Sequence, residues 1–153
     1  MKESNDGDLL RLLKDERAIL RTMHRYAHTL DYGDHDGFVD CFTENAVYES
    51  SRTGVLAGGA AELRDFASRY NHAPKAYNKH VMVDPLIEVD GDSATARSYY
   101  LFIQNRESGP AITHYGSYED RLARCPDGAW RITYRRLVNE AIAAGDVQPY
   151  RAR

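Results

Sequence analysis

The spacing of apolar residues is mainly helical over the first seventy residues. Residues 8–31 carry apolar side chains at three- and four-residue steps, which predicts one long amphipathic helix. The members of this apolar stripe are Leu9, Leu12, Leu13, Ile19, Leu20, Met23, Tyr26, Ala27 and Leu30. Gly33 follows as a typical helix stop. The spacing further predicts a short helix over residues 34–42, a brief strand over 46–49 and a third helix over 58–70.

Strand patterns take over from residue 79. Residues 80–89, 94–105, 112–124 and 129–138 are rich in β-branched and apolar residues, and turn signals separate them, beginning with Asp90-Gly91. Three helices followed by four antiparallel strands predict an α+β fold with the helices on one face of the sheet. Strand alternation places His80 and Met82 on one face and Val81 on the other. Both faces are apolar here, so we expect the sheet to be covered on both sides.

Length and composition limit the class of protein. A chain of 153 residues, 42% of them hydrophobic, is typical of one domain with one core. We expect a flexible segment over residues 1–7, the domain over 8–140 and a tail over 141–153. A net charge of -3 argues against a nucleic-acid partner.

Targeting and metal-binding signals are not found in the sequence. It contains neither an apolar run of membrane-spanning length nor a signal-peptide core, so we expect a cytoplasmic protein without a membrane partner. Cys41 and Cys125 are far apart and belong to no Cys-x-x-Cys or His-x-x-x-His spacing. We therefore predict no metal and no cofactor.

Several local strings resemble the SnoaL-like branch of the nuclear-transport-factor-2-like (NTF2-like) superfamily. They are YAHTLD at residues 26–31, DCFTENA at 40–46 and DGAWRI at 127–132, together with His80 at the start of the first long strand. The resemblance covers about residues 10–140, nearly a whole domain. It implies a cone in which N-terminal helices pack on a curved, mainly antiparallel sheet and enclose a pocket. It also implies a homodimer, or a higher homo-oligomer, formed through the sheet.

The resemblance also suggests site residues. Scytalone dehydratase, hexachlorocyclohexane dehydrochlorinase and bile-acid 7α-dehydratase place an Asp late in the first helix against a His on the first long strand. Asp31 and His80 stand at the corresponding positions here. The bile-acid enzyme has a pocket Tyr shortly before that Asp, which falls on Tyr26. An Arg of the last strand recurs in several relatives, and either Arg135 or Arg136 matches it, because a strand bulge would change which of them faces the pocket.

One departure from these relatives concerns a second pocket residue. Scytalone dehydratase has a further His on the following strand, and the bile-acid enzyme has an Asp near there. This chain has Gln104 and Asn105 instead, whose amides do no acid–base work. His114, one strand further, is a candidate substitute.

These residue types fit proton abstraction from carbon. An imidazole accepts a proton near neutral pH, and a carboxylate on its other nitrogen stabilises the imidazolium that forms. We therefore predict that His80 is a general base oriented by Asp31. Tyr26 and Tyr48 would donate to a substrate oxygen, and one Arg would hold developing oxyanion charge.

The predicted function is a cofactor-independent, dehydratase-like lyase or isomerase acting on a small hydrophobic, oxygenated substrate. One alternative is a non-catalytic small-molecule-binding module or accessory subunit of the same fold. Another is a polyketide cyclase or a hydroxylase-type tailoring enzyme. Each residue also has a structural interpretation: Asp31 as an acceptor of backbone N–H groups, the tyrosines as packing residues, and Arg135-Arg136 as a solvated strand end.

Overall fold

A computed structural model describes residues 3–143 of the chain, with side chains from residue 6 onward. The elements in chain order are α1 Glu3–Tyr32, α2 His35–Asp40, β1 Phe42–Ser50, β2 Gly54–Gly58, α3 Gly59–Arg69, β3 Lys79–Asp90, β4 Ser93–Arg106, β5 Gly109–Arg124 and β6 Trp130–Ile142.

The strands form one six-stranded mixed sheet in the order β2-β1-β6-β5-β4-β3. The predicted meander of four long antiparallel strands, β3 to β6, is confirmed. The other edge differs from the prediction in two respects. The strand predicted over residues 46–49 extends over Phe42–Ser50 and pairs in parallel with β6, and β2, a short strand of Gly, Ala, Val and Leu, had no clear strand pattern in the sequence. The parallel pairing places the first strand beside the last.

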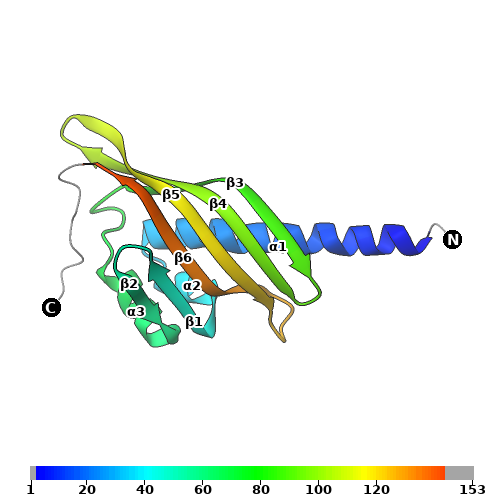
Figure 1. Cartoon of the computed structure of the whole chain (residues 1–153). Coiled ribbons are helices and arrows are strands. Elements are labelled where there is room, and N and C mark those ends of the chain that lie inside the picture. The colour runs from blue at the N-terminus through cyan, green and yellow to red at the C-terminus, as the bar shows by residue number, and fades with distance from the viewer. Residues whose placement is uncertain (1–2, 144–153) are drawn as a thin grey trace.

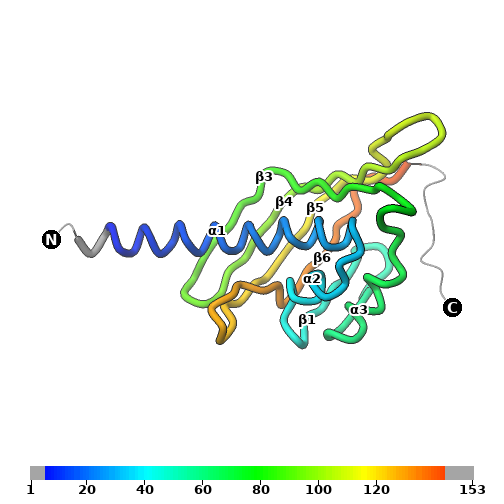
Figure 2. The backbone as a smooth tube through the Cα atoms, turned by 180° about the vertical axis from the view of Figure 1, so that it is seen from behind, coloured from blue at the N-terminus to red at the C-terminus, as the bar shows by residue number. Residues whose placement is uncertain are grey.

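Helix α1 crosses one face of the sheet, and its N-terminal part extends beyond the sheet edge (Figures 1 and 2). Its buried stripe is Ile19, Met23, Tyr26 and Leu30, at alternating four- and three-residue steps. The helix begins at Glu3 rather than at residue 8, and ends at Tyr32, followed by Gly33 in the left-handed region with φ +74°.

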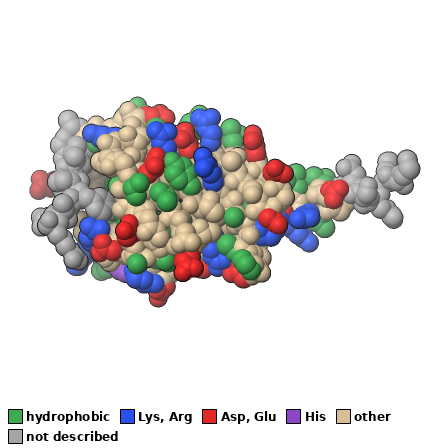
Figure 3. All heavy atoms as spheres, turned by 60° about the horizontal axis from the view of Figure 1, so that its bottom comes forward, with side chains coloured by type: hydrophobic (Ala, Val, Ile, Leu, Met, Phe, Trp, Pro, Cys, Tyr) green, Lys and Arg blue, Asp and Glu red, His purple; other side chains and the backbone are tan. Residues whose placement is uncertain are grey.

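The apolar stripe predicted for this helix is wrong over its N-terminal third. Leu9, Leu12 and Leu13 are exposed, and so is Leu10. Figure 3 shows the projecting part of α1 standing clear of the body of the domain. Leu12 borders the β3–β4 hairpin but is still 39% exposed, so helical periodicity alone overstated the buried length.

Asp15 anchors α1 where it enters the body. Its two carboxylate oxygens accept hydrogen bonds from the Arg124 guanidinium at 2.6 and 2.7 Å, and one of them also accepts from Trp130 Nε1 at 3.2 Å. The hydrogen bonds from Arg124 lower the pKa of Asp15 and outweigh the opposing effect of burial. A nearly buried carboxylate needs such partners, and here they tie the helix to the ends of β5 and β6.

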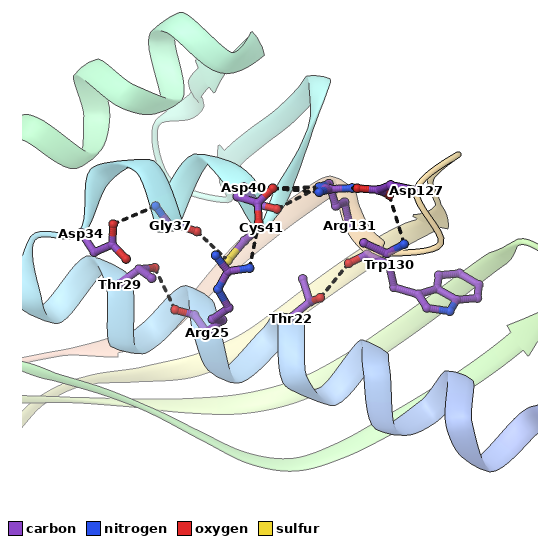
Figure 4. A network of polar contacts seen from close by, with 11 residues as sticks. Thr22, Arg25, Thr29, Asp34, Gly37, Asp40, Cys41, Asp127, Trp130 and Arg131 are labelled. Atoms are coloured by element: carbon purple, nitrogen blue, oxygen red, sulfur yellow. Dashed lines mark hydrogen bonds and ion pairs between the residues drawn. The ribbon is translucent and has the colours of Figure 1, made fainter.

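A second polar network fixes the C-terminal half of α1 (Figure 4). Arg25 and Arg131 both donate to Asp40, the last residue of α2, at 2.8 Å. Thr22 donates to the backbone carbonyl of Trp130 at 2.7 Å. The network holds α1, α2 and the start of β6 in register, and thereby sets the position of the last turn of α1.

The predicted division into segments stays a prediction, because residues 1–2 and 144–153 lie outside the described residues. Within the described residues, α1 starts inside the segment expected to be flexible, and β6 continues to Ile142. Over residues 3–143, no helix combines the length and the apolar character needed to cross a bilayer.

Candidate active site

The last turn of α1 and the start of β3 bring Asp31 and His80 together from 49 residues apart. Asp31 Oδ1 lies 2.6 Å from His80 Nδ1, and Asp31 Oδ2 accepts a hydrogen bond from the backbone N–H of His80 at 3.0 Å. The side chains are 4% and 11% exposed, respectively. A carboxylate near a helix C-terminus is disfavoured by the helix dipole, and these two contacts offset that cost. The two-point contact holds the carboxylate in one orientation against the ring.

The other ring nitrogen of His80 faces Tyr70. Its Nε2 lies 3.3 Å from the Tyr70 hydroxyl, and the ring packs against Phe102 at a centroid distance of 4.7 Å. When Nδ1–H donates to Asp31, the neutral imidazole carries its lone pair on Nε2, and the tyrosine hydroxyl donates to it. The sequence placed Tyr70 only at the end of the third predicted helix, over residues 58–70. The structure places it at the C-cap of α3, where the chain turns back toward His80.

The structure separates the two candidate arginines. Arg135 lies on the inner face, fully buried, and donates through Nε and Nη2 to the two oxygens of Asp120, both at 2.7 Å. Arg136 lies on the outer face, half exposed, within 3.4 Å of Glu49 and 3.3 Å of Glu119. Only Arg135 therefore belongs to the interior that contains the Asp31–His80 pair.

Aromatic rings enclose the Arg135 guanidinium. It lies 4.1 Å from the centroid of the Tyr26 ring and 4.2 Å from that of Tyr118. Burial opposes the charge of Arg135, but Asp120 outweighs it and raises the Arg135 pKa. Burial also raises the pKa values of Tyr26 and Tyr118 well above their usual range. The tyrosines therefore stay protonated near neutral pH as hydrogen-bond donors, and the guanidinium stays charged.

The remaining predicted residues lie around this centre. The hydroxyls of Tyr26 and Tyr48 are 2.9 Å apart. His114 lies on β5 opposite Phe102 of β4, with its Nδ1 2.9 Å from the Thr113 hydroxyl. Burial lowers the pKa of His114. Phe102 contacts the rings of both His80 and His114, so the two histidines flank one aromatic side chain.

Comparison with known proteins identifies the family. The model of the SnoaL-like domain matches residues 11–136. The chain belongs to the SnoaL-like domain family. No curated protein matches the chain.

Solved structures show the same fold as this SnoaL-like domain. Rv3472 of Mycobacterium tuberculosis, described as a protein of unknown function, is 36% identical over 88% of this chain and 75% of its own, with a TM-score of 0.75. An NTF2-like protein with a cystatin-like fold from Novosphingobium aromaticivorans is 22% identical over 94% of this chain and 92% of its own, with a TM-score of 0.81. A protein from Catenulispora acidiphila in complex with S-DNPA is 18% identical over 83% of this chain and 94% of its own, with a TM-score of 0.73. The NTF2-like, α+β fold expected from the sequence is confirmed.

Two surface hollows of the SnoaL-like domain lie away from this centre. The larger, about 410 Å³, is on the outward side of α1, and the smaller, about 220 Å³, lies where α1 meets the β3–β4 hairpin. Neither is lined by Asp31 or His80. Across the part of the chain that is described, no three His, Cys, Asp or Glu side chains are grouped so that they could hold a metal ion.

Proposed function

We propose that this SnoaL-like domain is a cofactor-independent lyase or isomerase in which His80 removes a proton from carbon. The observation that supports this most strongly is the two-point contact of Asp31 with His80, through the ring at 2.6 Å and through the backbone at 3.0 Å. A carboxylate held in this way selects the tautomer with its lone pair on Nε2 and stabilises the imidazolium. A histidine that served only to fill the core would not need that arrangement.

In the proposed reaction, Nε2 takes the proton from a carbon next to a substrate carbonyl, and the electron pair of the broken C–H bond moves into an enolate. In a dehydratase-type reaction the enolate re-forms the carbonyl and a C=C bond forms to the neighbouring carbon, whose hydroxyl leaves as water with the proton that His80 Nε2 had taken. In an isomerase-type reaction the substrate is unsaturated, and its dienolate takes the proton back from His80 Nε2 at the γ-carbon, so that the double bond shifts. Positioned general bases contribute roughly 10²- to 10⁴-fold to such steps.

Tyr70 has to give up its contact with Nε2 for this to happen. Its hydroxyl occupies the position that the substrate C–H would take, at 3.3 Å from Nε2. Tyr70 follows the end of α3, where the backbone is already extended. We propose that the substrate displaces this hydroxyl from Nε2, and that the hydroxyl then donates to a substrate oxygen.

The oxyanion would be held by the buried donors on the inner face. The hydroxyls of Tyr26 and Tyr48 are already paired, and the Arg135 guanidinium lies against the Tyr26 ring. Fixed donors of this kind, shielded from water, stabilise developing negative charge strongly. The aromatic surroundings of His80 support a small hydrophobic ligand that carries an oxygen. The S-DNPA complex of the Catenulispora protein is in line with a small-molecule ligand.

Exchange of carbon-bound hydrogen for deuterium tests the proposed proton abstraction on simple model compounds. A panel of small cyclic ketones and β-hydroxyketones is incubated with the protein in D₂O, and deuterium incorporation is followed by NMR. We expect His80→Gln to slow exchange of the active compounds by at least about 100-fold. His28→Gln, a change of the same type on the exposed side of α1, is the matched control and should leave the rate unchanged. Equal rates in wild type and His80→Gln would remove His80 from the mechanism.

A binding module or accessory subunit is the second candidate function. Two observations favour it: Tyr70 covers Nε2 of His80, and neither surface hollow includes the Asp31–His80 pair. In that case compounds of the panel would bind in equilibrium dialysis without any deuterium exchange. Exchange that depends on His80 would exclude this alternative, whereas the choice between dehydratase, cyclase and tailoring chemistry depends on the product formed.

We also propose that two copies pair through the outer face of the sheet. Tyr99, Ile112 and Tyr115 are exposed there and lie on the adjacent strands β4 and β5. Exposed apolar side chains on adjacent strands are typical of an interface. A Tyr99→Glu variant should lower the mass measured by sedimentation if this face forms the dimer.

A further inference from the structure

The Asp31–His80 pair is nearly closed off from solvent. The His80 side chain is 11% exposed, its Nε2 faces Tyr70, and neither of the two surface hollows includes it. A substrate therefore reaches Nε2 only if part of the chain moves. Residues 71–78, which join Tyr70 to the start of β3, lie beside the C-terminal end of α1 in both views of the backbone (Figures 1 and 2). This position places them next to the pair.

Residues 71–78 form a loop that is closed by its own hydrogen bonds. The side chain of Asn78 donates to the backbone carbonyl of Asn71 at 3.4 Å, so the two ends of the loop are joined. Inside it, the N–H of Ala76 donates to the carbonyl of His72 at 3.1 Å. Half of the loop residues are exposed, and only Asn78 is buried. A compact surface loop that buries little apolar area can separate from the domain at low cost.

Two contacts hold this loop against the turn between α1 and α2. The N–H of Ala73 donates to the backbone carbonyl of Asp31 at 3.0 Å. The His72 ring lies over Gly33, where an added Cβ would come within 2.5 Å of the ring nitrogen Nδ1. The ring is fixed in this position because its Nδ1–H donates to the carbonyl of Ala73 at 2.9 Å. Asp31 therefore contacts His80 through its carboxylate and the loop through its backbone.

The closed position of the loop carries a cost at His35. The rings of His72 and His35 are in edge-to-face contact, with centroids 5.6 Å apart. His35 Nε2 is buried and has no hydrogen-bond partner among the described residues. A buried polar atom without a partner costs free energy, which is recovered when water reaches it. Movement of the His72 ring away from His35 would admit water there, and this lowers the free energy needed to open the loop.

We propose that residues 71–78 are a lid over the Asp31–His80 pair, and that His72, packed on Gly33, is the latch of this lid. Loops that close over a reacting group exclude water from it and open to admit the substrate. The purpose of the lid rests on the proposed function, because it admits a substrate to the base. The movement of the lid does not depend on that function.

The two ends of the lid differ in how firmly they are held. At the β3 end, Lys79 already pairs with β4, and the His80 N–H donates to Asp31, so the base stays in place. At the α3 end, Tyr70 follows the last residue of the helix with an extended backbone. Opening therefore carries Tyr70 away from Nε2 while the contact between Asp31 and His80 is kept.

Diethyl pyrocarbonate, which acylates an unprotonated imidazole nitrogen, measures access to His80 Nε2. Tryptic digestion after a brief reaction releases residues 80–97, in which His80 is the only histidine, so mass spectrometry follows this residue by itself. We expect Gly33→Ala, whose added carbon displaces the His72 ring, to raise the rate of His80 modification about tenfold. Gly128→Ala is the matched control. Gly128 has nearly the same φ as Gly33, +82° against +74°, but nothing lies within 4 Å of the added carbon.

His72→Ala separates the latch from strain in the backbone. It removes the ring without adding a clash, so it should also raise the rate of His80 modification. In the double variant Gly33→Ala/His72→Ala, the carbon added at position 33 has no ring to meet. The rate should therefore equal that of His72→Ala instead of combining the two effects.

Unchanged rates of His80 modification in Gly33→Ala and His72→Ala would overturn the lid, and so would an equal rise in Gly128→Ala. The reagent reports access to Nε2 and not turnover, so faster modification in both variants supports the lid even if no compound exchanges deuterium. Conversely, deuterium exchange that depends on His80, together with unchanged modification rates, would keep the base and overturn the lid alone.

Discussion

The buried pair of Arg135 and Asp120 makes a prediction that needs no substrate. Both side chains are 0% exposed and joined by two hydrogen bonds of 2.7 Å. Replacing Arg135 with Met leaves the Asp120 carboxylate buried without its cation. Breaking a buried pair in this way costs about 3–5 kcal/mol, a large part of the 5–15 kcal/mol that typically stabilises a domain. For a chain of this size the melting temperature should fall by roughly 6–20 °C.

Removing both charges should cost less than removing one. In Arg135→Met/Asp120→Val, no unpaired charge remains in the interior, and apolar side chains fill the space. We therefore expect the double variant to be more stable than either single variant. The cost that remains comes from the lost contacts of the guanidinium with the rings of Tyr26 and Tyr118, which are about 4 Å from it.

Urea denaturation followed by fluorescence provides the measurement, because Trp130 is the single tryptophan of the chain and is 2% exposed. Arg136→Met is the matched control, since Arg136 is adjacent in sequence but 41% exposed on the outer face. It should cost no more than about 1 kcal/mol. If Arg135→Met cost as little as Arg136→Met, or if the double variant lost the sum of the two single losses, the reasoning would be refuted.

Three further predictions concern the tautomer of His80, a close contact in the sheet and the pH dependence of stability. Asp31→Asn should change the ¹⁵N NMR shifts of His80 from the Nδ1–H form to a mixture, because an amide can donate to Nδ1 as well as accept from it. Gly116→Ala should cost about 3 kcal/mol by urea denaturation, since the added carbon would lie 1.9 Å from the carbonyl oxygen of Val138. Asp15→Asn should cost about 2–3 kcal/mol at neutral pH. Folding lowers the Asp15 pKa. The stability difference between wild type and Asp15→Asn should therefore have its full size above the unfolded pKa of about 4, and it should shrink as the pH falls below that value.

Each of these predictions has a contradicting result. Unchanged His80 shifts in Asp31→Asn would mean that the carboxylate does not select the tautomer. A Gly116→Ala variant as stable as wild type would mean that β5 and β6 can separate at no cost. A stability difference for Asp15→Asn that stayed constant from pH 7 to pH 2 would show that ionisation of Asp15 contributes nothing.

The sequence by itself determined the elements with a clear period and the identity of the central pair. The 3.6-residue period marked α1, and apolar strand segments separated by turn signals marked β3 to β6, because these patterns depend on neighbours along the chain. The resemblance to relatives indicated Asp31 and His80, which the structure brings within hydrogen-bond distance. The interaction of His80 Nε2 with Tyr70 carried no local signal, because it depends on how the chain returns from α3 to β3.

Tertiary structure alone decided which arginine faces the interior. Leu122 pairs with Ile132 and Arg121 pairs with Tyr134, so Thr133 is an extra residue in β6. This bulge reverses the alternation of β6: Ile132 is buried before it and Arg135 after it. The exposure of the leucines in α1 was decided in the same way. Periodicity shows which residues share a face, but only packing between distant segments determines whether another element covers that face.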